Sequence, residues 1–310
     1  MTAHSGFIAA ALLASAIAAT ACSDSDKASK STAVKPGPVT PQTAGTSYVP
    51  EPVVPVTPPK PVTFRDGEAA YHAGNFAEAT AMFTRLTEEK PGNAWGHYML
   101  GLSASKAGDV KTATKAFDEA LRIDPKHVKS LINSARLLID QKQPDEALPR
   151  LDHAVVLEPE SNAAHRLFGR AYAAQGKVDE AIAAYERAID LDPNDSWSLN
   201  NLGLLLFEQG RAADAVPLLT QAVELRKDVA IFSNNLGMAL EHTGQFGAAA
   251  SSYRHAVEAE PANEKAKRNL ARVEGRKDTG PTPEAGALQA LIRAKVGLKA
   301  SLAAQNVATM

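Results

Sequence analysis

The chain has 310 residues and a formal net charge of −2, with a sequence pI near 6.5. Nothing in this charge balance resembles the basic footprint of a nucleic-acid-binding protein, so no nucleic-acid partner is expected. A single cysteine excludes an internal disulfide and cysteine-rich zinc motifs, and an aromatic content of 5% in an Ala- and Leu-rich chain favours helices over sheets.

The N-terminus begins with an uncharged apolar run, "FIAAALLASAIAATA", at residues 7–21, which is too short to span a bilayer comfortably. A short apolar segment that ends in small residues is typical of a secretory signal peptide. The following "ATAC", which ends at Cys22, resembles the lipobox of bacterial lipoproteins. The resemblance implies a signal peptide at 1–21, a lipid on Cys22 and, from Ser23, an outer-membrane protein facing the periplasm. The alternatives are an ordinary signal peptide and a soluble periplasmic protein, or a buried apolar helix.

Residues 22–62 are rich in proline, as in "KPGPVTPQTAGTSYVPEPVVPVTPPKPV", and show no helical period. Such a composition is typical of an extended or disordered linker. We therefore expect a tether between the membrane and a folded domain.

A 34-residue period occupies most of the remaining chain. Proline follows it at Pro91, Pro125, Pro159, Pro193 and Pro261, with Lys227 at the missing position. A small residue keeps the same phase at Gly67, Gly101, Ala135, Gly169, Gly203 and Gly237. A bulky apolar residue does so at Phe83, Phe117, Leu151, Tyr185, Leu219 and Tyr253.

This pattern, clearest in "AYAAQGKVDEAIAAYERAIDLDPND", resembles the tetratricopeptide repeat (TPR) family. The resemblance implies an all-α, right-handed solenoid of six helix-turn-helix repeats. Small residues let the two helices of a repeat approach closely, and the bulky residue fills the remaining gap. One hairpin cannot bury its apolar face alone, so neighbouring repeats stack.

Two helical segments follow the sixth repeat. The charged stretch "NEKAKRNLARVEG" is expected to form a capping helix with a polar outer face, which completes a domain at 63–275. Residues 276–310 are expected to be a linker and an amphipathic helix. That helix packs on the end of the solenoid or docks on a partner or a membrane surface.

Asparagines recur in the first helix of the later repeats, which in TPR proteins lines the concave face. The fifth and sixth positions of these helices include Asn133, Asn200, Asn201, Asn234, Asn235 and Asn269. Side-chain amides both donate and accept hydrogen bonds, so these residues are candidate ligands for the backbone of an extended peptide. The alternative is that they form local hydrogen bonds between helices.

Basic residues on the same helices suit partners that carry carboxylates. The candidates are Arg136, Arg166, Arg170, Arg268 and Arg272. The alternative is neutralisation by acids of the same surface, such as Glu208 and Glu241.

No catalytic, nucleotide-binding or metal-binding motif was found, so we expect no enzyme activity, cofactor or metal. The predicted function is a protein–protein interaction scaffold. Signal peptide, lipobox, tether and repeats together resemble the pilotin-type lipoproteins of type IV pilus systems and the repeat lipoproteins of tight-adherence pilus assembly. That resemblance implies support of a pilus or secretin. The alternatives are an adaptor for cell-wall enzymes and a periplasmic co-chaperone.

Overall fold

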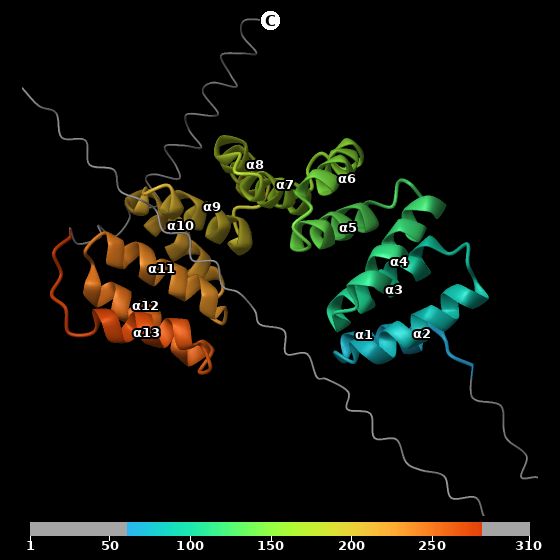
Figure 1. The fold of residues 1–310 in the computed structure, drawn as a ribbon, viewed down its shortest axis with the longest axis horizontal. Coiled ribbons are helices and arrows are strands. Elements are labelled where there is room, and N and C mark those ends of the chain that lie inside the picture. The colour runs from blue at the N-terminus through green and yellow to red at the C-terminus, as the bar shows by residue number, and fades with distance from the viewer. Residues whose placement is uncertain (1–60, 281–310) are drawn as a thin grey trace, which may run out of the picture. The chain divides into compact units, whose positions relative to one another are not determined.

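A computed structural model of the chain describes residues 61–280, and the regular structure of these residues is entirely helical (Figure 1). Their helices are α1 (Phe64–His72), α2 (Phe76–Glu89), α3 (Ala94–Ala107), α4 (Val110–Ile123), α5 (Val128–Asp140), α6 (Pro144–Leu157), α7 (Asn162–Ala174), α8 (Val178–Leu191), α9 (Ser196–Glu208), α10 (Ala212–Leu225), α11 (Ala230–His242), α12 (Phe246–Ala259) and α13 (Glu264–Val273).

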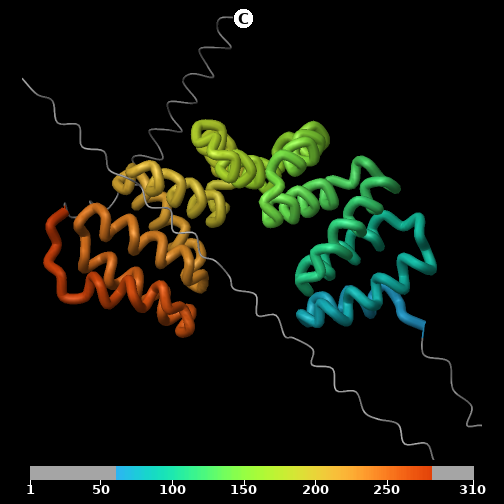
Figure 2. Tube along the Cα trace, in the orientation of Figure 1, coloured from blue at the N-terminus to red at the C-terminus, as the bar shows by residue number. Residues whose placement is uncertain are grey.

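The helices form six hairpins that follow one another along the chain, as the Cα trace in Figure 2 shows, and α13 packs on the last hairpin. The odd-numbered helix of each hairpin is its A helix, and the even-numbered helix is its B helix. Each B helix packs against the A helices before and after it, and from α3 to α13 each A helix also contacts the next. The expected all-α solenoid is therefore confirmed, and the surface of α3, α5, α7, α9, α11 and α13 is called the A-helix face.

The helices of a hairpin are held together by the small and bulky residues of the 34-residue period. A Cβ atom placed on Gly237 would lie 2.5 Å from Cε1 of Tyr253, and one on Gly203 would lie 2.7 Å from Cγ of Leu219. The third repeat has an alanine instead of glycine, and Ala135 and Leu151 are both fully buried. The bulky residue therefore packs directly on the backbone of the A helix, because nothing larger than a methyl group separates them.

The turn from an A helix to its B helix needs one residue with a positive φ. Glycine occupies this position in five repeats, for example Gly176 with φ 73°, whereas Lys142 occupies it in the third repeat with φ 61°. A side chain in the left-handed region costs free energy that glycine avoids. The third repeat therefore contains a locally strained turn.

The ends of the chain lie outside the described residues. This applies to the expected signal peptide at 1–21, to Cys22, to the tether as far as residue 60 and to the tail from residue 281. The first described helix begins at Phe64, and the side chain of Thr63 caps it by accepting a hydrogen bond from the backbone N–H of Asp66. Between residues 61 and 280, no helix has the length and apolar character needed to cross a membrane.

Candidate peptide-binding face

Four of the candidate asparagines form two equivalent hydrogen bonds between A helices. Nδ2 of Asn235 on α11 donates to Oδ1 of Asn200 on α9 at 3.0 Å, and Nδ2 of Asn269 on α13 donates to Oδ1 of Asn234 on α11 at 2.9 Å. The four side chains are buried, with exposed fractions of 3–7%. They therefore make the hydrogen bonds between helices that the sequence left open as the alternative to peptide contact.

The other two candidate asparagines are half-buried. Asn201 accepts a hydrogen bond from Nδ2 of Asn200 at 3.2 Å. Burial raises the pKa of Tyr185, and a hydrogen bond with Asn201 partly opposes that rise. Asn133 donates to the backbone oxygen of Lys129 at 2.8 Å and accepts from Nη1 of Arg136 at 2.7 Å. Both residues thus lie on the A-helix face with part of their surface open to solvent.

Three of the candidate arginines form ion pairs with acids on neighbouring A helices. Nη1 of Arg166 lies 2.6 Å from Oδ2 of Asp195, which is 4% exposed and also accepts a hydrogen bond from Ser198. Nη2 of Arg170 lies 2.6 Å from Oδ1 of Asp140. These two pairs join α7 to the start of α9 and to the end of α5, so they stabilise the stacking of repeats.

The third ion pair joins α13 to α11. Arg272 donates to both carboxylate oxygens of Glu241, from Nε at 2.8 Å and from Nη2 at 2.6 Å. The hydroxyl of Tyr253 donates to the same carboxylate at 2.9 Å. The bond from Arg272 and the bond from Tyr253 lower the pKa of Glu241, and burial opposes this shift. Burial, followed by the interaction with Glu241, raises the pKa of Tyr253.

The remaining two arginines differ, because no carboxylate among residues 61–280 forms an ion pair with Arg136 or Arg268. Arg136 lies half-buried on α5. Burial together with the nearby charges of Arg166 and Arg170 lowers its pKa, and the charge of Asp140 partly opposes this shift. Arg268 is exposed on α13. A guanidinium that lacks an acid partner is the group on this face best able to bind a carboxylate from another molecule.

Among the acids of these three ion pairs, Glu241 was expected from sequence to neutralise an arginine, whereas Asp140 and Asp195 were not. A signal for them was present, because all three ion pairs join residues that are 29–31 positions apart. That separation is close to one repeat. Comparing each arginine with the acids about one repeat away would have identified these partners.

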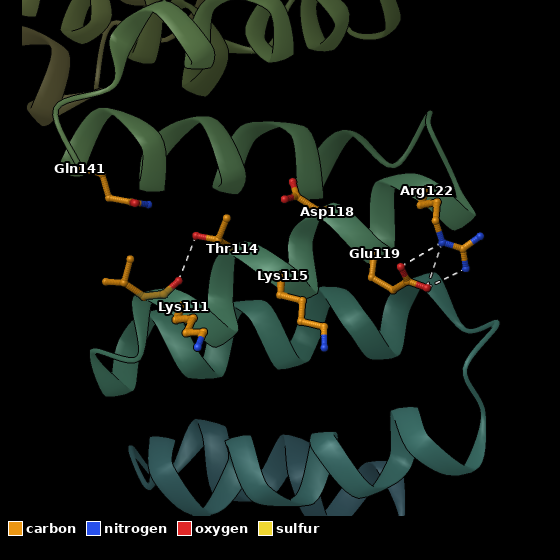
Figure 3. Close-up of a pocket in the computed structure, with 8 residues that line it drawn as sticks. Lys111, Thr114, Lys115, Asp118, Glu119, Arg122 and Gln141 are labelled. Carbon is orange, nitrogen blue, oxygen red and sulfur yellow. Dashed lines mark hydrogen bonds and ion pairs between the residues drawn. The ribbon is translucent and has the colours of Figure 1, made fainter.

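A separate pocket of about 750 Å³ lies beside α4 (Figure 3). Three of its charged residues form ion pairs, Glu119 with Arg122 within α4 and Asp118 with Arg150 of α6. Arg122 lies 2.6 Å from Glu119, and the hydroxyl of Thr114 donates to the carbonyl of Val110 at 3.0 Å. Lys111 and Lys115 are surface side chains of the same helix (Figure 3). We assign no binding site here, because few polar groups from different elements converge.

In the described part of the chain, no three His, Cys, Asp or Glu residues are grouped to hold a metal ion.

Family models match the helical region of the chain without a gap. Models described as tetratricopeptide repeat match residues 64–128, 104–171 and 200–274, and a model described as TPR repeat matches residues 169–210. The chain belongs to the tetratricopeptide repeat family. A search of curated proteins finds no match to this TPR protein.

Solved structures share the fold of this TPR protein at low sequence identity. A tetratricopeptide repeat protein from Parabacteroides merdae has 18% identity and a TM-score of 0.58, with 67% of this chain and 82% of that chain covered. PilW, described as a widely conserved type IV pilus biogenesis factor, has 18% identity and a TM-score of 0.60, with 67% and 95% covered. A TPR protein from Thermus thermophilus has 20% identity and a TM-score of 0.51, with 58% and 98% covered.

The TPR fold is typical of non-enzymatic protein–protein interaction scaffolds. The partners expected of such a fold are therefore proteins or peptides.

Proposed function

We propose that this TPR protein is a lipid-anchored scaffold of the bacterial cell envelope that holds extended, carboxylate-bearing segments of pilus or secretin assembly proteins. The observation that carries the peptide-binding part is the unequal pairing of arginines on the A-helix face. Arg166, Arg170 and Arg272 each form an ion pair with an acid, whereas neither Arg136 nor Arg268 forms one among the described residues. A carboxylate of a partner would form charge-assisted hydrogen bonds with either of the latter two guanidinium groups.

The asparagines contribute to this proposal in two ways. Asn133 and Asn201 are half-buried on the A-helix face, where their amides can hydrogen-bond with the backbone of an extended segment. The buried asparagines join α9 to α11 and α11 to α13, so they fix the spacing of the A helices that carry Asn201 and Arg268. These buried asparagines are Asn200, Asn234, Asn235 and Asn269.

The envelope part of the proposal is supported by the N-terminal sequence and by one structural neighbour. The apolar run at 7–21 and the following Cys22 suit a signal peptide and lipid attachment, and several acyl chains anchor a protein more stably than one. PilW, whose fold matches over nearly its whole length, is described as a type IV pilus biogenesis factor. These features favour pilus assembly over a cell-wall or chaperone role.

Site-specific photo-crosslinking in native membranes tests the proposal. A photoreactive phenylalanine derivative replaces Trp197 on α9, whose side chain is 43% exposed, and the matched control replaces Val156 on α6, which is 76% exposed. We expect the α9 position, but not the α6 position, to capture a secretin or a neighbouring assembly component. In a strain that lacks this protein, we expect secretin multimers and piliation to decrease. Capture of cell-wall hydrolases alone, with normal piliation, would exclude the pilus proposal.

Two substitutions separate anchoring from binding. Cys22→Ala should abolish incorporation of labelled fatty acid and release the protein from membranes, and wild-type protein that takes up no label would contradict the anchor. Arg136→Gln should weaken capture of the partner while the helices remain folded. It is a better probe than reversing the charge of Arg166, because Arg166 neutralises the buried Asp195.

A further inference from the structure

The residues that follow α13 fold back on the last hairpin. Residues 274–280, called the strap, run from the end of α13 to the turn between α11 and α12. The backbone N–H groups of Thr279 and Gly280 donate to the carbonyl of Gly244 at 2.9 and 3.1 Å. A Cβ atom on Gly280 would overlap the carbonyl of Thr243, so the close approach requires a glycine.

The strap also caps the N-terminus of α12. Oδ1 of Asp278 accepts a hydrogen bond from the backbone N–H of Gly247, the second residue of α12, at 2.8 Å. A carboxylate at this position satisfies a donor that the helix leaves unpaired. From sequence, residues 276–310 were expected to be a linker and an amphipathic helix, and no repeat pattern indicated this contact.

With the strap in place, a pocket of about 350 Å³ forms between it and helices α9, α11, α12 and α13. Its apolar lining comes from Phe207, Met238 and Phe246, and its charged lining comes from Glu241, Arg272 and Arg276. His242 completes the lining. An apolar cavity with a few polar groups at its edge is the usual form of a binding pocket. Its lining residues belong to A helices, to the start of a B helix and to the strap.

The charges around this pocket are not balanced. Arg272 is engaged by both oxygens of Glu241, whereas Cζ of Arg276 lies 3.8 Å from the ring centre of Phe246, and no carboxylate in residues 61–280 forms an ion pair with Arg276. A guanidinium that stacks on an aromatic ring keeps its N–H donors free at its edge. The pocket therefore combines an apolar lining with one positive charge in excess.

We propose that this pocket binds an apolar side chain of a partner segment and that Arg276 binds an acidic side chain next to it. The pocket is open to solvent, so a partner segment can place one residue in it. This inference rests on the proposed function, since it specifies the chemistry of the partner at one end of that face. It adds Arg276, Phe246 and Met238 to the residues that determine which segments bind.

The test uses the full-length chain with Cys22→Ala and ¹³C-methyl-labelled methionine. The chain has five methionines, and loss of one signal in a Met238→Leu variant assigns the reporter in the pocket. The probes are two capped peptides, acetyl-Ala-Glu-Phe-Ala-amide and its Gln counterpart, at millimolar concentrations. We expect both peptides to shift the Met238 methyl signal. The Glu peptide should bind about three- to fivefold more tightly than the Gln peptide, which is the contribution of a partly exposed charge pair.

Arg276→Gln should bring the two peptides to equal affinity, whereas the matched control Arg226→Gln, at the end of α10, should leave the difference unchanged. Asp278→Asn should weaken both peptides, because it loosens the strap. The proposal is overturned if neither peptide shifts Met238, if wild-type protein binds both equally, or if Arg276→Gln keeps the difference. It is also overturned if the peptides bind only to a variant that carries Leu291→Ser and Ile292→Ser. The chain's own tail would then be the occupant of the pocket in the unsubstituted protein.

These outcomes are separate from those of the crosslinking experiment. If crosslinks from α9 recover a pilus component while the Glu and Gln peptides bind equally, the proposed function stands and the assignment of Arg276 fails. If the peptides behave as expected while no envelope protein is captured, the pocket stands and the pilus proposal fails.

Discussion

The side-chain amide of Asn235 donates a hydrogen bond to the side-chain oxygen of Asn200 at 3.0 Å, between the A helices of two successive repeats. The same bond joins Asn269 to Asn234 one repeat later, at 2.9 Å. The donor lies 35 residues after the acceptor in both cases, one residue more than the repeat length. Because the four groups are buried, each bond satisfies polar atoms that would otherwise have no partner in a mainly apolar interface.

Replacing one asparagine of the Asn200–Asn235 pair should lower the free energy of unfolding more than replacing both. Asn235→Leu leaves Oδ1 of Asn200 buried without its donor, and an unsatisfied buried polar group costs about 1–3 kcal/mol. In the double variant Asn200→Leu, Asn235→Leu, neither buried group is left unpaired. Asn201 loses the hydrogen bond from Asn200, but it is half-buried and can bond to water, so we expect part of that stability to return. Urea unfolding followed by circular dichroism measures both values. A double variant that is less stable than the single one would show that the pair has a packing role that leucine cannot fill.

The packing of small against bulky residues predicts that two glycine substitutions lower the stability of the protein by different amounts. Gly237→Ala forces a methyl group against the rigid ring of Tyr253, whereas Gly203→Ala faces Leu219, a pairing that Ala135 and Leu151 already form in the third repeat. Overpacking costs about 1–3 kcal/mol, so we expect Gly237→Ala in this range and Gly203→Ala below it. Thermal unfolding of the two variants measures both losses of stability. Equal costs would mean that the flexibility of the facing side chain does not matter.

The left-handed turn at Lys142 predicts a stabilising substitution. Lys142→Gly removes the cost of a side chain at positive φ and adds the smaller cost of glycine's freedom in the unfolded chain. We expect a net gain of about 0.5–1 kcal/mol. The reverse change, Gly176→Lys at the same place in the next repeat, should lower stability. If Lys142→Gly destabilises the protein, contacts of the lysine side chain outweigh the backbone term.

The depressed pKa of Glu241 predicts a stability contribution that depends on pH. A carboxyl group whose pKa is lower in the folded state stabilises the fold when it is ionised, and this contribution disappears as pH falls through the folded-state pKa. Wild-type protein should therefore be more stable than the Glu241→Gln variant at pH 7. The difference should shrink below about pH 5. Urea unfolding at neutral and acidic pH measures it, and a difference that stays constant with pH would contradict the role of Arg272.

The fold was predictable from sequence because each repeat has the same physical requirement. A hairpin of two helices needs a small residue where the helices cross and a bulky one opposite, so Gly169 and Tyr185 recur with their equivalents every 34 residues. The identity of the side chains determines this packing locally. The hydrophobic pattern of one repeat therefore predicts the next, and neither a long-range contact nor a ligand is needed to recognise it.

The candidate binding face was only partly predictable. The sequence placed Asn235 and Arg166 on A helices, but the relation between one repeat and the next determines whether each side chain meets an internal partner or solvent. Arg166 forms an ion pair with Asp195 29 residues later, whereas Arg136 on the preceding A helix forms no ion pair within residues 61–280. Only the stacked structure distinguishes these two arginines, because an ion pair depends on the distance between two repeats.

The sequence alone thus determined that this chain is a helical repeat protein. The tertiary structure decided which polar side chains are used to hold the repeats together and that residues 274–280 return to the last hairpin. The strap follows no repeat, so its position depends on one close glycine contact and one helix cap. Both are contacts between residues more than 30 positions apart, at Gly244 with Gly280 and at Gly247 with Asp278.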